Sequence, residues 1–232
     1  MRSMTTPITG ISSMATRALL AELGSTFERH FGLKLAIEAV GGVDAAKRVA
    51  GGEAFDLVFL AADAIDKLIA AGHLAPGSRV DLVRSPVAVA VKSGTPHPDI
   101  GSEEALQRAL RAARSIGYST GPSGVHLIKL FERWGLAEEL AARTVQAPPG
   151  VPVASLVARG EVALGFQQLS ELMNVPGVDV IGPLPGAAQF ITTFSAGLGR
   201  GGAHAAAARA ALAWMNSPEA ADIKRRHGME PA

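Results

Sequence analysis

The sequence predicts an α/β fold built from two lobes, and three observations lead to this prediction. Short apolar segments with strand character alternate with segments of helical periodicity along nearly the whole chain. The 232 residues suit one large domain or two small lobes, and 26 glycines with 14 prolines supply many turns. Two long apolar strands, at about 81–91 and 190–198, divide the chain into parts.

The first part of the chain has the pattern of three strand–helix pairs. The strands are expected at Pro7–Ile11, Leu35–Val40 and Phe55–Leu60, the last of them continuously apolar, as buried parallel strands are. The first helix has leucine and phenylalanine every three or four residues up to Phe31, and Gly32 ends it. Asp44 and Asp63 are the expected N-caps of the next two helices, which reach Ala50 and Gly72.

The same alternation continues to the end of the chain. Strands are expected at Asp81–Val91, Ser115–Tyr118, Thr144–Gln146, Val162–Phe166, Val178–Ile181 and Phe190–Leu198. Helices are expected from Ser102, at about Val125–Trp134, at Val153–Ala158, at Ala203–Met215 and after Ser217-Pro218. If the two long strands cross between lobes, lobe 1 comprises residues 1–84 plus 194–232, and lobe 2 comprises 85–193.

Composition excludes several classes of function. Lys and Arg number 22 against 21 Asp and Glu, and aromatic residues are 5%, so neither a strong positive field nor a base-stacking platform for nucleic acid is expected. The chain has no cysteine, and its six histidines show no metal-ligand spacing, so we expect no metal site and no cofactor. No stretch approaches the length of a membrane span.

A series of loose motifs, taken in order, resembles a known family. They are Ile11-Ser12-Ser13-Met14, Phe27–Gly32, Phe55–Asp63, Gly94-Thr95-Pro96, Leu156–Glu161, Gly165–Gln168 and Asn216–Ala220. Together they resemble the molybdate-binding-protein-like branch of the type 2 periplasmic binding proteins, over nearly the whole chain. The resemblance implies mixed sheets flanked by helices, with a ligand cleft between two lobes that close on the ligand about a hinge.

The resemblance also implies where ligand contacts lie. They come from the turn after the first strand, the turn after the second, and helix N-termini in the second lobe. In this sequence these are Ser12 and Ser13, then Gly41 and Gly42, then Ser119, Thr120, Ser123 and Gly124. Hydroxyls and free backbone N–H groups at helix N-termini independently favour an anion site.

Departures from the family pattern favour a small organic carboxylate as the anion. Molybdate binders usually carry a Ser-Ser-Gly type turn after the second strand, where this chain has Gly41-Gly42 followed by Asp44. Arg84, near the expected hinge, can pair with a carboxylate in bidentate fashion. Gln167, with Gln168 beside it, ends an apolar strand where ligand-facing polar groups lie in open α/β sheets. The main prediction is therefore a solute-binding module for a small anionic ligand.

Two other functions stay open. Some chains of this fold class resemble enzymes that isomerise unsaturated tricarboxylic acids, as aconitate isomerase does by a 1,3-proton shift. That reading needs a positioned acid or base, for which Ser13 and His126 are the catalytic candidates, with Arg84 as an anchor. The second alternative is the molybdate- or oxyanion-binding component of an ABC transporter, which would bring a transporter partner. With no export signal visible, the location is expected to be cytoplasmic, or periplasmic if a signal peptide has been removed.

Two further motifs point weakly to other chemistry. Gly117–Gly121 matches the Gly-x-Ser-x-Gly elbow of hydrolases, and Asp179 with His204 or His227 follows in the right order. However, the helix after Ser119 is expected to start late, behind Pro122 and Gly124. Gly197–Gly202 matches Gly-x-Gly-x-x-Gly, but no further strand ending in an acid follows it, so a plain loop is the better reading.

Overall fold

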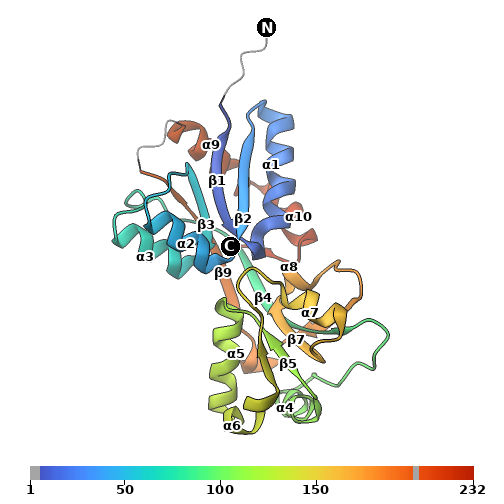
Figure 1. Cartoon of the computed structure of the whole chain (residues 1–232). Helices are drawn as coiled ribbons and strands as arrows, with labels where there is room; N and C mark the ends of the chain where they lie inside the picture. Colours follow the sequence, from blue (N-terminus) through green and yellow to red (C-terminus); the bar gives the residue numbers. More distant parts are fainter. Residues whose placement is uncertain (1–5, 201–203) are drawn as a thin grey trace. The chain divides into compact units, whose positions relative to one another are not determined.

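Two parts of the chain each build a sheet and a core in the computed structural model, which describes residues 6–200 and 204–232 (Figure 1). Unit 1 comprises the described residues of Met1–Arg84 and Thr193–Ala232, and unit 2 is Ser85–Thr192. Two long strands, β4 (Val80–Lys92) and β9 (Ile191–Leu198), contribute residues to both units. The α/β class predicted from the sequence is confirmed.

Unit 1 begins with three strand–helix pairs, as the sequence predicts. They are β1 (Ile8–Ser13), the short 3-10 helix η1 (Met14–Thr16) and α1 (Arg17–Phe31); β2 (Leu35–Val40) and α2 (Gly42–Ala50); β3 (Leu57–Ala61) and α3 (Ala62–Ala70). After the return of the chain in β9 come α9 (Ala205–Met215), α10 (Pro218–Arg226) and β10 (Glu230–Pro231). The strand order is β2-β1-β3-β9, with β1 parallel to β2 and β3, and β9 antiparallel to β3. β10 pairs with Val83 and Arg84 of β4.

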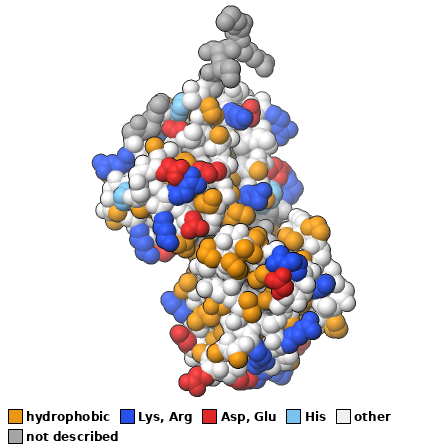
Figure 2. Space-filling view, viewed as in Figure 1, with side chains coloured by type: hydrophobic (Ala, Val, Ile, Leu, Met, Phe, Trp, Pro, Cys, Tyr) orange, Lys and Arg blue, Asp and Glu red, His pale blue; other side chains and the backbone are white. Residues whose placement is uncertain are grey.

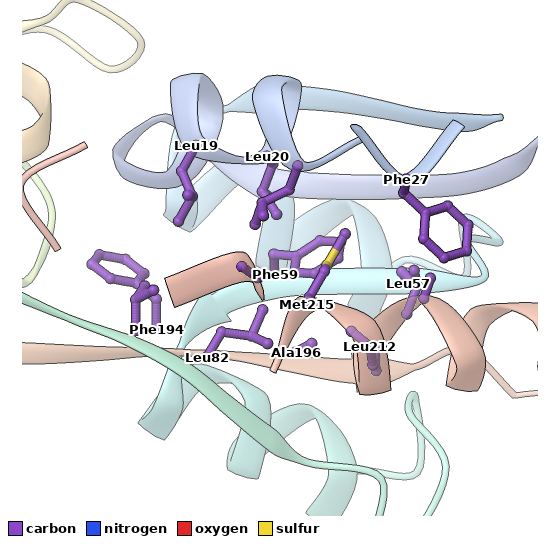
Figure 3. Close-up of a cluster of buried hydrophobic side chains, with 14 of the residues drawn as sticks. Leu19, Leu20, Phe27, Leu57, Phe59, Leu82, Phe194, Ala196, Leu212 and Met215 are labelled. Carbon is purple, nitrogen blue, oxygen red and sulfur yellow. The ribbon is translucent and has the colours of Figure 1, made fainter. Parts of the chain in front are cut away.

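Strand β3 shows how the unit-1 sheet is covered on both faces. Its continuous apolar run splits by alternation: Leu57 and Phe59 lie in one cluster, and Val58 and Leu60 lie in the other. The first cluster packs under α1, α9 and α10, and Figure 3 shows Leu19, Leu20, Phe27, Leu212 and Met215 gathered around it. The second cluster packs under α2 and α3 through Ala45, Val49, Ile65 and Leu68. A strand buried on both faces needs apolar residues at every position.

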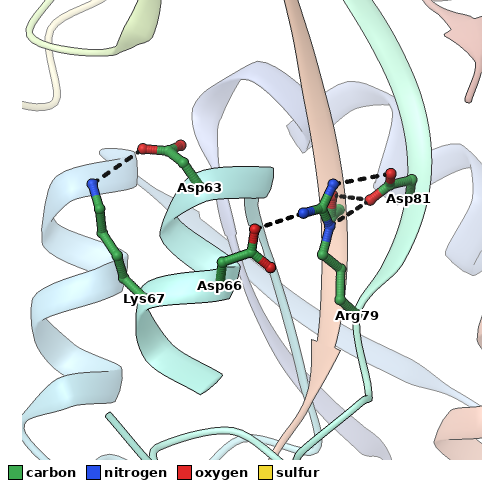
Figure 4. Close-up of polar contacts among 6 residues, drawn as sticks. Asp63, Asp66, Lys67, Arg79 and Asp81 are labelled. Atoms are coloured by element: carbon green, nitrogen blue, oxygen red, sulfur yellow. Dashed lines mark hydrogen bonds and ion pairs between the residues drawn. The ribbon is translucent and has the colours of Figure 1, made fainter. Parts of the chain in front are cut away.

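A group of ion pairs joins α3 to the start of β4 in unit 1 (Figure 4). Arg79 Nη1 lies 2.6 Å from Asp66 Oδ2, and its Nε lies 2.7 Å from Asp81 Oδ1. Ser195 of β9 donates a hydrogen bond of 2.7 Å to Asp81 Oδ1. The hydrogen bond from Arg79 is the main cause that lowers the pKa of Asp81. These contacts fix the position of the strand that leads into unit 2.

Unit 2 contains the middle of the chain. In order, its elements after β4 are α4 (Glu103–Ala112), β5 (Ile116–Tyr118), α5 (Pro122–Arg133), α6 (Ala137–Leu140), η2 (Ala141–Arg143), β6 (Thr144–Gln146), α7 (Val153–Arg159), β7 (Leu164–Gln168), α8 (Leu169–Leu172), β8 (Val178–Pro183) and η3 (Gly186–Ala188). β5 is parallel to β6 and β7, whereas β7 and β8 are antiparallel to β4. Helices α5 and α7 lie beside β5 and β7 (Figure 1).

The core of unit 2 repeats the two-faced arrangement. Val87, Val89 and Val91 of β4 lie in a cluster with residues of α4 and α5, while Ala88 and Ala90 lie in a cluster with residues of α7 and α8. The alanines of β4 therefore face α7 and α8, and the larger valines face α4 and α5. Because alanine side chains are small, α7 and α8 can pack close to the sheet.

Several helix starts differ from the expectations. The predicted N-caps Asp44 and Asp63 are wrong, because the caps are Gly41 and Ala61 and both acids lie in the first turn. The helix expected from Val125 already begins at Pro122. At α2 and α3 the strand passes into the helix through a small residue with extended backbone, so each helix starts earlier than an acidic cap would indicate. Ala203, the expected first residue of the helix before Ser217, lies outside the described residues, and α9 is described from Ala205.

The surface fits the near-neutral charge of the chain. On the face shown in Figure 2, the Lys and Arg side chains are interspersed with Asp and Glu side chains rather than gathered by sign. Within the described ranges, every helix falls short of the length and apolar character needed to cross a membrane.

Candidate functional site

The parallel strands of unit 1 end together at one edge of its sheet. Ser13, the last residue of β1, pairs with Val40, the last residue of β2, and Ser12 pairs with Phe59 of β3. A helix starts directly after β2 and after β3. We call this the unit-1 edge, defined by Ser12, Ser13, Gly41, Gly42, Ala61 and Ala62. Ser12 and Ser13, expected in the turn after the strand, are instead its last two residues, where the pleat gives them opposite directions.

The two serines of the unit-1 edge differ in their hydrogen bonds. Ser12 is fully buried, and its hydroxyl lies 3.4 Å from the carbonyl oxygen of Glu38. Ser13 is 7% exposed, and its Oγ has no hydrogen-bond partner in the part of the chain that the structure describes. A buried hydroxyl without a partner costs about 1–3 kcal/mol. Of the two, Ser13 therefore has the hydroxyl whose hydrogen-bonding capacity is unused within the described residues.

Two helix N-termini at the unit-1 edge leave backbone donors available. The N-caps of α2 and α3 are Gly41 and Ala61, and neither makes a side-chain capping bond. A Cβ atom on Gly42 would lie 3.4 Å from the Cβ of Ser13, so the start of α2 adjoins the free hydroxyl. First-turn N–H groups without a cap attract anions. Ala61 and Ala62 were not among the predicted site residues; their signal in the sequence was a pair of small residues at the end of a buried strand.

The unit-2 edge is the matching end of the second sheet, defined by Ser119, Ser123, Gly124, Val153, Gln167 and Gln168. β5 and β7 run parallel and end together there, with Tyr118 paired to Phe166. The Oγ atoms of Ser119 and Ser123 lie 3.0 Å apart, and the backbone N–H of Gly121 donates to Ser119 Oγ at 3.2 Å. Ser123 and Gly124 lie in the first turn of α5 and are buried. The predicted loop residues thus do come together, except that Thr120 is exposed.

The two glutamines that end β7 use their amides differently. Gln167 Oε1 accepts a hydrogen bond of 2.9 Å from the backbone N–H of Val153, and Gln167 Nε2 donates one of 2.8 Å to Glu171 Oε1. Gln168 Nε2 contacts Thr192 Oγ1 at 2.7 Å, and Gln168 Oε1 is buried with no partner within the described residues. Because the Thr192 hydroxyl can donate as well as accept, the Gln168 amide can present either its oxygen or its NH₂ group. Gln168, rather than the predicted Gln167, has the free amide end.

Glu171 is a titratable group of this surface that the sequence analysis missed. It lies in α8, three residues after Gln168, and is partly buried. Burial raises the pKa of Glu171 to about 7, against the opposing effect of the hydrogen bond from Gln167. Its signal in the sequence was an acid just after the Gln-Gln end of an apolar strand.

Arg84 and His126 already have contacts of their own. Arg84 is exposed, and its Nη2 donates to the carbonyl oxygen of Pro231 at 3.1 Å. The His126 ring stacks on Phe190 with centroids 4.6 Å apart, and its Nε2 lies 2.8 Å from the carbonyl oxygen of Ala188. Both residues therefore hold neighbouring segments in place. Among the residues placed in the structure, no three His, Asp or Glu side chains gather as a metal site would require.

The Gly-x-Ser-x-Gly and Gly-x-Gly-x-x-Gly motifs do not form the sites that they would indicate. Asp179 accepts hydrogen bonds from Ser93 and Gly94, and His204 Nδ1 lies 3.3 Å from Asp56, so neither pairs with Ser119 as a triad would need. In the glycine motif, Gly201 and Gly202 lie outside the described residues. Gly199 donates to the carbonyl oxygen of Asp56, so its backbone is used within unit 1.

Replacing Ser13 by alanine is expected to leave the free energy of unfolding unchanged or to raise it by up to about 1 kcal/mol, because no bond is lost and a buried polar atom is removed. Ser195→Ala is the matched control: it too is a buried strand serine of unit 1, but its hydroxyl bonds to Asp81. The control should lose about 1.5–3 kcal/mol. Urea unfolding of the two variants measures both values. Equal losses would mean that the Ser13 hydroxyl has a partner in the folded chain.

Comparisons with known proteins agree on the family and the fold. Residues 8–230 match the family model described as bacterial extracellular solute-binding protein. A curated relative, the aconitate isomerase of Pseudomonas sp., is 40% identical over 232 positions, which cover 97% of this chain and 88% of the relative.

Solved structures give the same fold at lower identity. The periplasmic molybdate-binding protein of Azotobacter vinelandii has a TM-score of 0.79 at 21% identity, covering 96% of this chain and 98% of that one. The sulfate-binding protein of Mycobacterium tuberculosis has a TM-score of 0.78 at 16% identity, covering 98% and 88%. At these identities the likeness shows the fold alone, and it confirms the type 2 periplasmic-binding-protein fold predicted from the sequence.

Proposed function

Because the chain belongs to the bacterial extracellular solute-binding protein family, we propose that it binds an unsaturated tricarboxylate and isomerises it by moving one proton. The observation that carries this proposal is the 40% identity to an aconitate isomerase over 97% of the chain. That identity favours the isomerase alternative of the sequence analysis over a module that only binds its ligand. It also favours a carboxylate over molybdate, since the oxyanion-binding proteins are similar in fold at far lower identity.

The two edges support the proposal chemically. A tricarboxylate carries up to three negative charges. Each edge by itself offers backbone donors for carboxylate oxygens, at the uncapped N-termini of α2 and α3 in unit 1 and at that of α5 in unit 2. The free hydroxyl of Ser13 and the Ser119–Ser123 pair add further donors. The free amide end of Gln168 can orient a protonated or an ionised carboxyl group.

A binding module without turnover is the second candidate, favoured by the likeness of the fold to binding proteins of transporters. In that case a transporter is the partner, and the ligand is still a small anion. The family is described as extracellular, which favours the periplasmic alternative over the cytoplasmic one.

One series of measurements separates these functions. Thermal unfolding is followed with trans-aconitate, cis-aconitate, citrate, molybdate and sulfate, and a ligand at 100 times its Kd should add about 2.7 kcal/mol of stability. Samples that show a shift are then followed by ¹H NMR in D₂O. We expect stabilisation by trans-aconitate, its conversion to the cis isomer, and uptake of deuterium at the allylic carbon. Binding without conversion supports the module, and a shift with molybdate alone supports the oxyanion binder.

The same assay locates the ligand contacts. Ser13→Ala removes the free hydroxyl of the unit-1 edge, and Ser123→Ala removes one hydroxyl of the unit-2 edge. Each loss of a hydrogen bond to a charged group should weaken binding by roughly 10- to 100-fold. Ser25→Ala, an exposed serine of α1, is the control that should bind as the wild type does.

A further inference from the structure

Glu171 lies three residues after Gln168 of the unit-2 edge, and its side chain accepts a hydrogen bond from Gln167 of that edge. It belongs to α8, the four-residue helix that follows β7 without a break. Its one recorded hydrogen bond within the described residues comes from Gln167, at 2.8 Å to Oε1. No Lys, Arg or His of the described chain forms an ion pair with it. Burying a carboxylate without a cation costs stability, so burial favours the protonated form of this group.

A short relay of hydrogen bonds fixes the orientation of this carboxyl group. The backbone N–H of Val153 donates to Gln167 Oε1, which settles which end of the Gln167 amide is the oxygen. The other end of the amide is therefore the NH₂ group, and this group donates to Glu171 Oε1. One oxygen of Glu171 is held in this way, so the second is free to exchange a proton.

The surroundings of Glu171 allow both of its protonation states near neutral pH. Within unit 2, α8 packs against β7, α7 and β8. The charged residues on those elements are used elsewhere: Arg159 at the end of α7 pairs with Glu161, and Asp179 of β8 accepts from Ser93. Leu172, the next residue along α8, is buried with Ala88, Ala90 and Ala154. The pKa of Glu171 is about 7 because of burial rather than a neighbouring charge.

We propose that Glu171 is the catalytic residue that removes the allylic proton of the tricarboxylate and returns it at the other end of the allylic unit. This rests on the isomerase function proposed above. The carboxylate takes a proton from the methylene carbon as that C–H bond breaks, and the electron pair moves into the adjacent C–C bond. The double bond shifts by one position, and the far carbon takes the proton back from the Glu171 carboxylic acid. No oxidant, reductant or cofactor is needed, and the enzyme ends as it began.

The other candidate acids and bases of unit 2 are less suited to this step. His126 has its ring stacked on Phe190 and its Nε2 bonded to the Ala188 carbonyl. The Ser119 and Ser123 hydroxyls bond to each other, with no recorded base beside them. A general base works best with a pKa close to the working pH, and a carboxyl group in a water-poor setting reaches that range.

The test compares Glu171→Gln with the wild type, using trans-aconitate as the probe. The amide has nearly the same shape and keeps a contact with Gln167, so the Kd for trans-aconitate should stay within about threefold. Because a general base contributes about 10²- to 10⁴-fold, kcat and the rate of deuterium uptake should both fall at least 100-fold. Glu161→Gln, an exposed acid of the same unit that pairs with Arg159, should change neither.

The outcomes separate this inference from the function on which it rests. A Glu171→Gln variant that turns over at the wild-type rate overturns the role of Glu171 and leaves the isomerase function standing. A wild-type protein that binds trans-aconitate without deuterium uptake overturns the isomerase function itself.

If circular dichroism shows that Glu171→Gln does not fold, the pH dependence of kcat/KM of the wild type serves as the test instead. There kcat/KM should fall about tenfold per pH unit below about pH 7 as Glu171 becomes protonated. A flat profile from pH 6 to 8 overturns the proposal.

Discussion

Replacing Gly124 by alanine is expected to cost about 3 kcal/mol or more of stability and to abolish ligand binding at the unit-2 edge. A Cβ atom on Gly124 would lie 1.8 Å from the carbonyl oxygen of Ser119 and 2.9 Å from its carbonyl carbon. These are backbone atoms, so the contact cannot be relieved by a side-chain rotation. Overpacking in a buried place costs about 1–3 kcal/mol even where side chains can adjust. The start of α5 must therefore move away from Ser119, and the Ser119–Ser123 contact is lost with it.

Gly121→Ala is the matched control for this substitution. Gly121 is in the same loop and is the N-cap of α5, but a Cβ there meets only Ser119 Oγ, at an ordinary 3.6 Å. It should lose less than about 1 kcal/mol. Urea unfolding and binding of trans-aconitate are measured for both variants. If Gly124→Ala is as stable as the control, the close approach of α5 to Ser119 is not a feature of the folded protein.

Because of Lys224, the free energy of unfolding is expected to rise with pH between about pH 8 and pH 10.5. It is 2% exposed in α10, and its Nζ donates to the Leu82 carbonyl oxygen at 2.9 Å and to Asn216 Oδ1 at 3.0 Å. No carboxylate bonds to it among the described residues, and burial lowers its pKa from 10.5 to about 8. Below pH 8 the folded protein holds a buried charge that the unfolded chain exposes to water, so folding bears a cost.

The sign of the effect follows from proton binding. Between pH 8 and 10.5 the unfolded chain binds more protons at Lys224 than the folded protein, so the free energy of unfolding rises with pH. Relative to Lys224→Met, the wild type should gain on the order of 3 kcal/mol over this range. Urea unfolding at pH 7, 8, 9 and 10.5 measures the difference. Lys129→Met, an exposed lysine of α5, should follow the wild type. A constant difference between wild type and Lys224→Met would contradict the lowered pKa.

Much of the fold could be predicted from the sequence, because its strands and long helices have clear periodicity. The run Leu57–Leu60 reads as a buried strand, and it is buried on both faces. Helices α6 and α8 were missed, since four residues make barely one turn and show no repeat. The predicted N-caps of α2 and α3 were wrong because acids are common at N-caps, whereas this chain has a small residue with extended backbone at each of the two caps.

The candidate site could be predicted as a set of segments but not in its detail. The serine pair at 12–13 and the loop 119–124 stood out from their composition. That Ser13 rather than Ser12 has the free hydroxyl depends on the pleat of β1 and on the position of Glu38 of β2. Gln167 and Gln168 are equivalent in the sequence, and only the position of Val153, from a distant segment, assigns their roles. Glu171 was missed for the same reason, since its partner and its burial arise from tertiary contacts.

Because the chain returns to unit 1 through β9, the strand pairs of the two units become possible at different times during synthesis. Unit 2 is one continuous segment, Ser85–Thr192, and β5, β6 and β7 find all of their partners inside it. Unit 1 is not continuous, because β3 pairs with β9, Leu57 with Leu198, and β10 pairs back to Arg84. A chain leaving the ribosome can therefore form every strand pair of unit 2 while β3 still lacks a neighbour on one side. Such long-range pairing slows folding and leaves a strand edge exposed in the nascent chain. The sheet that starts the sequence is thus the last whose strand partners are all synthesised.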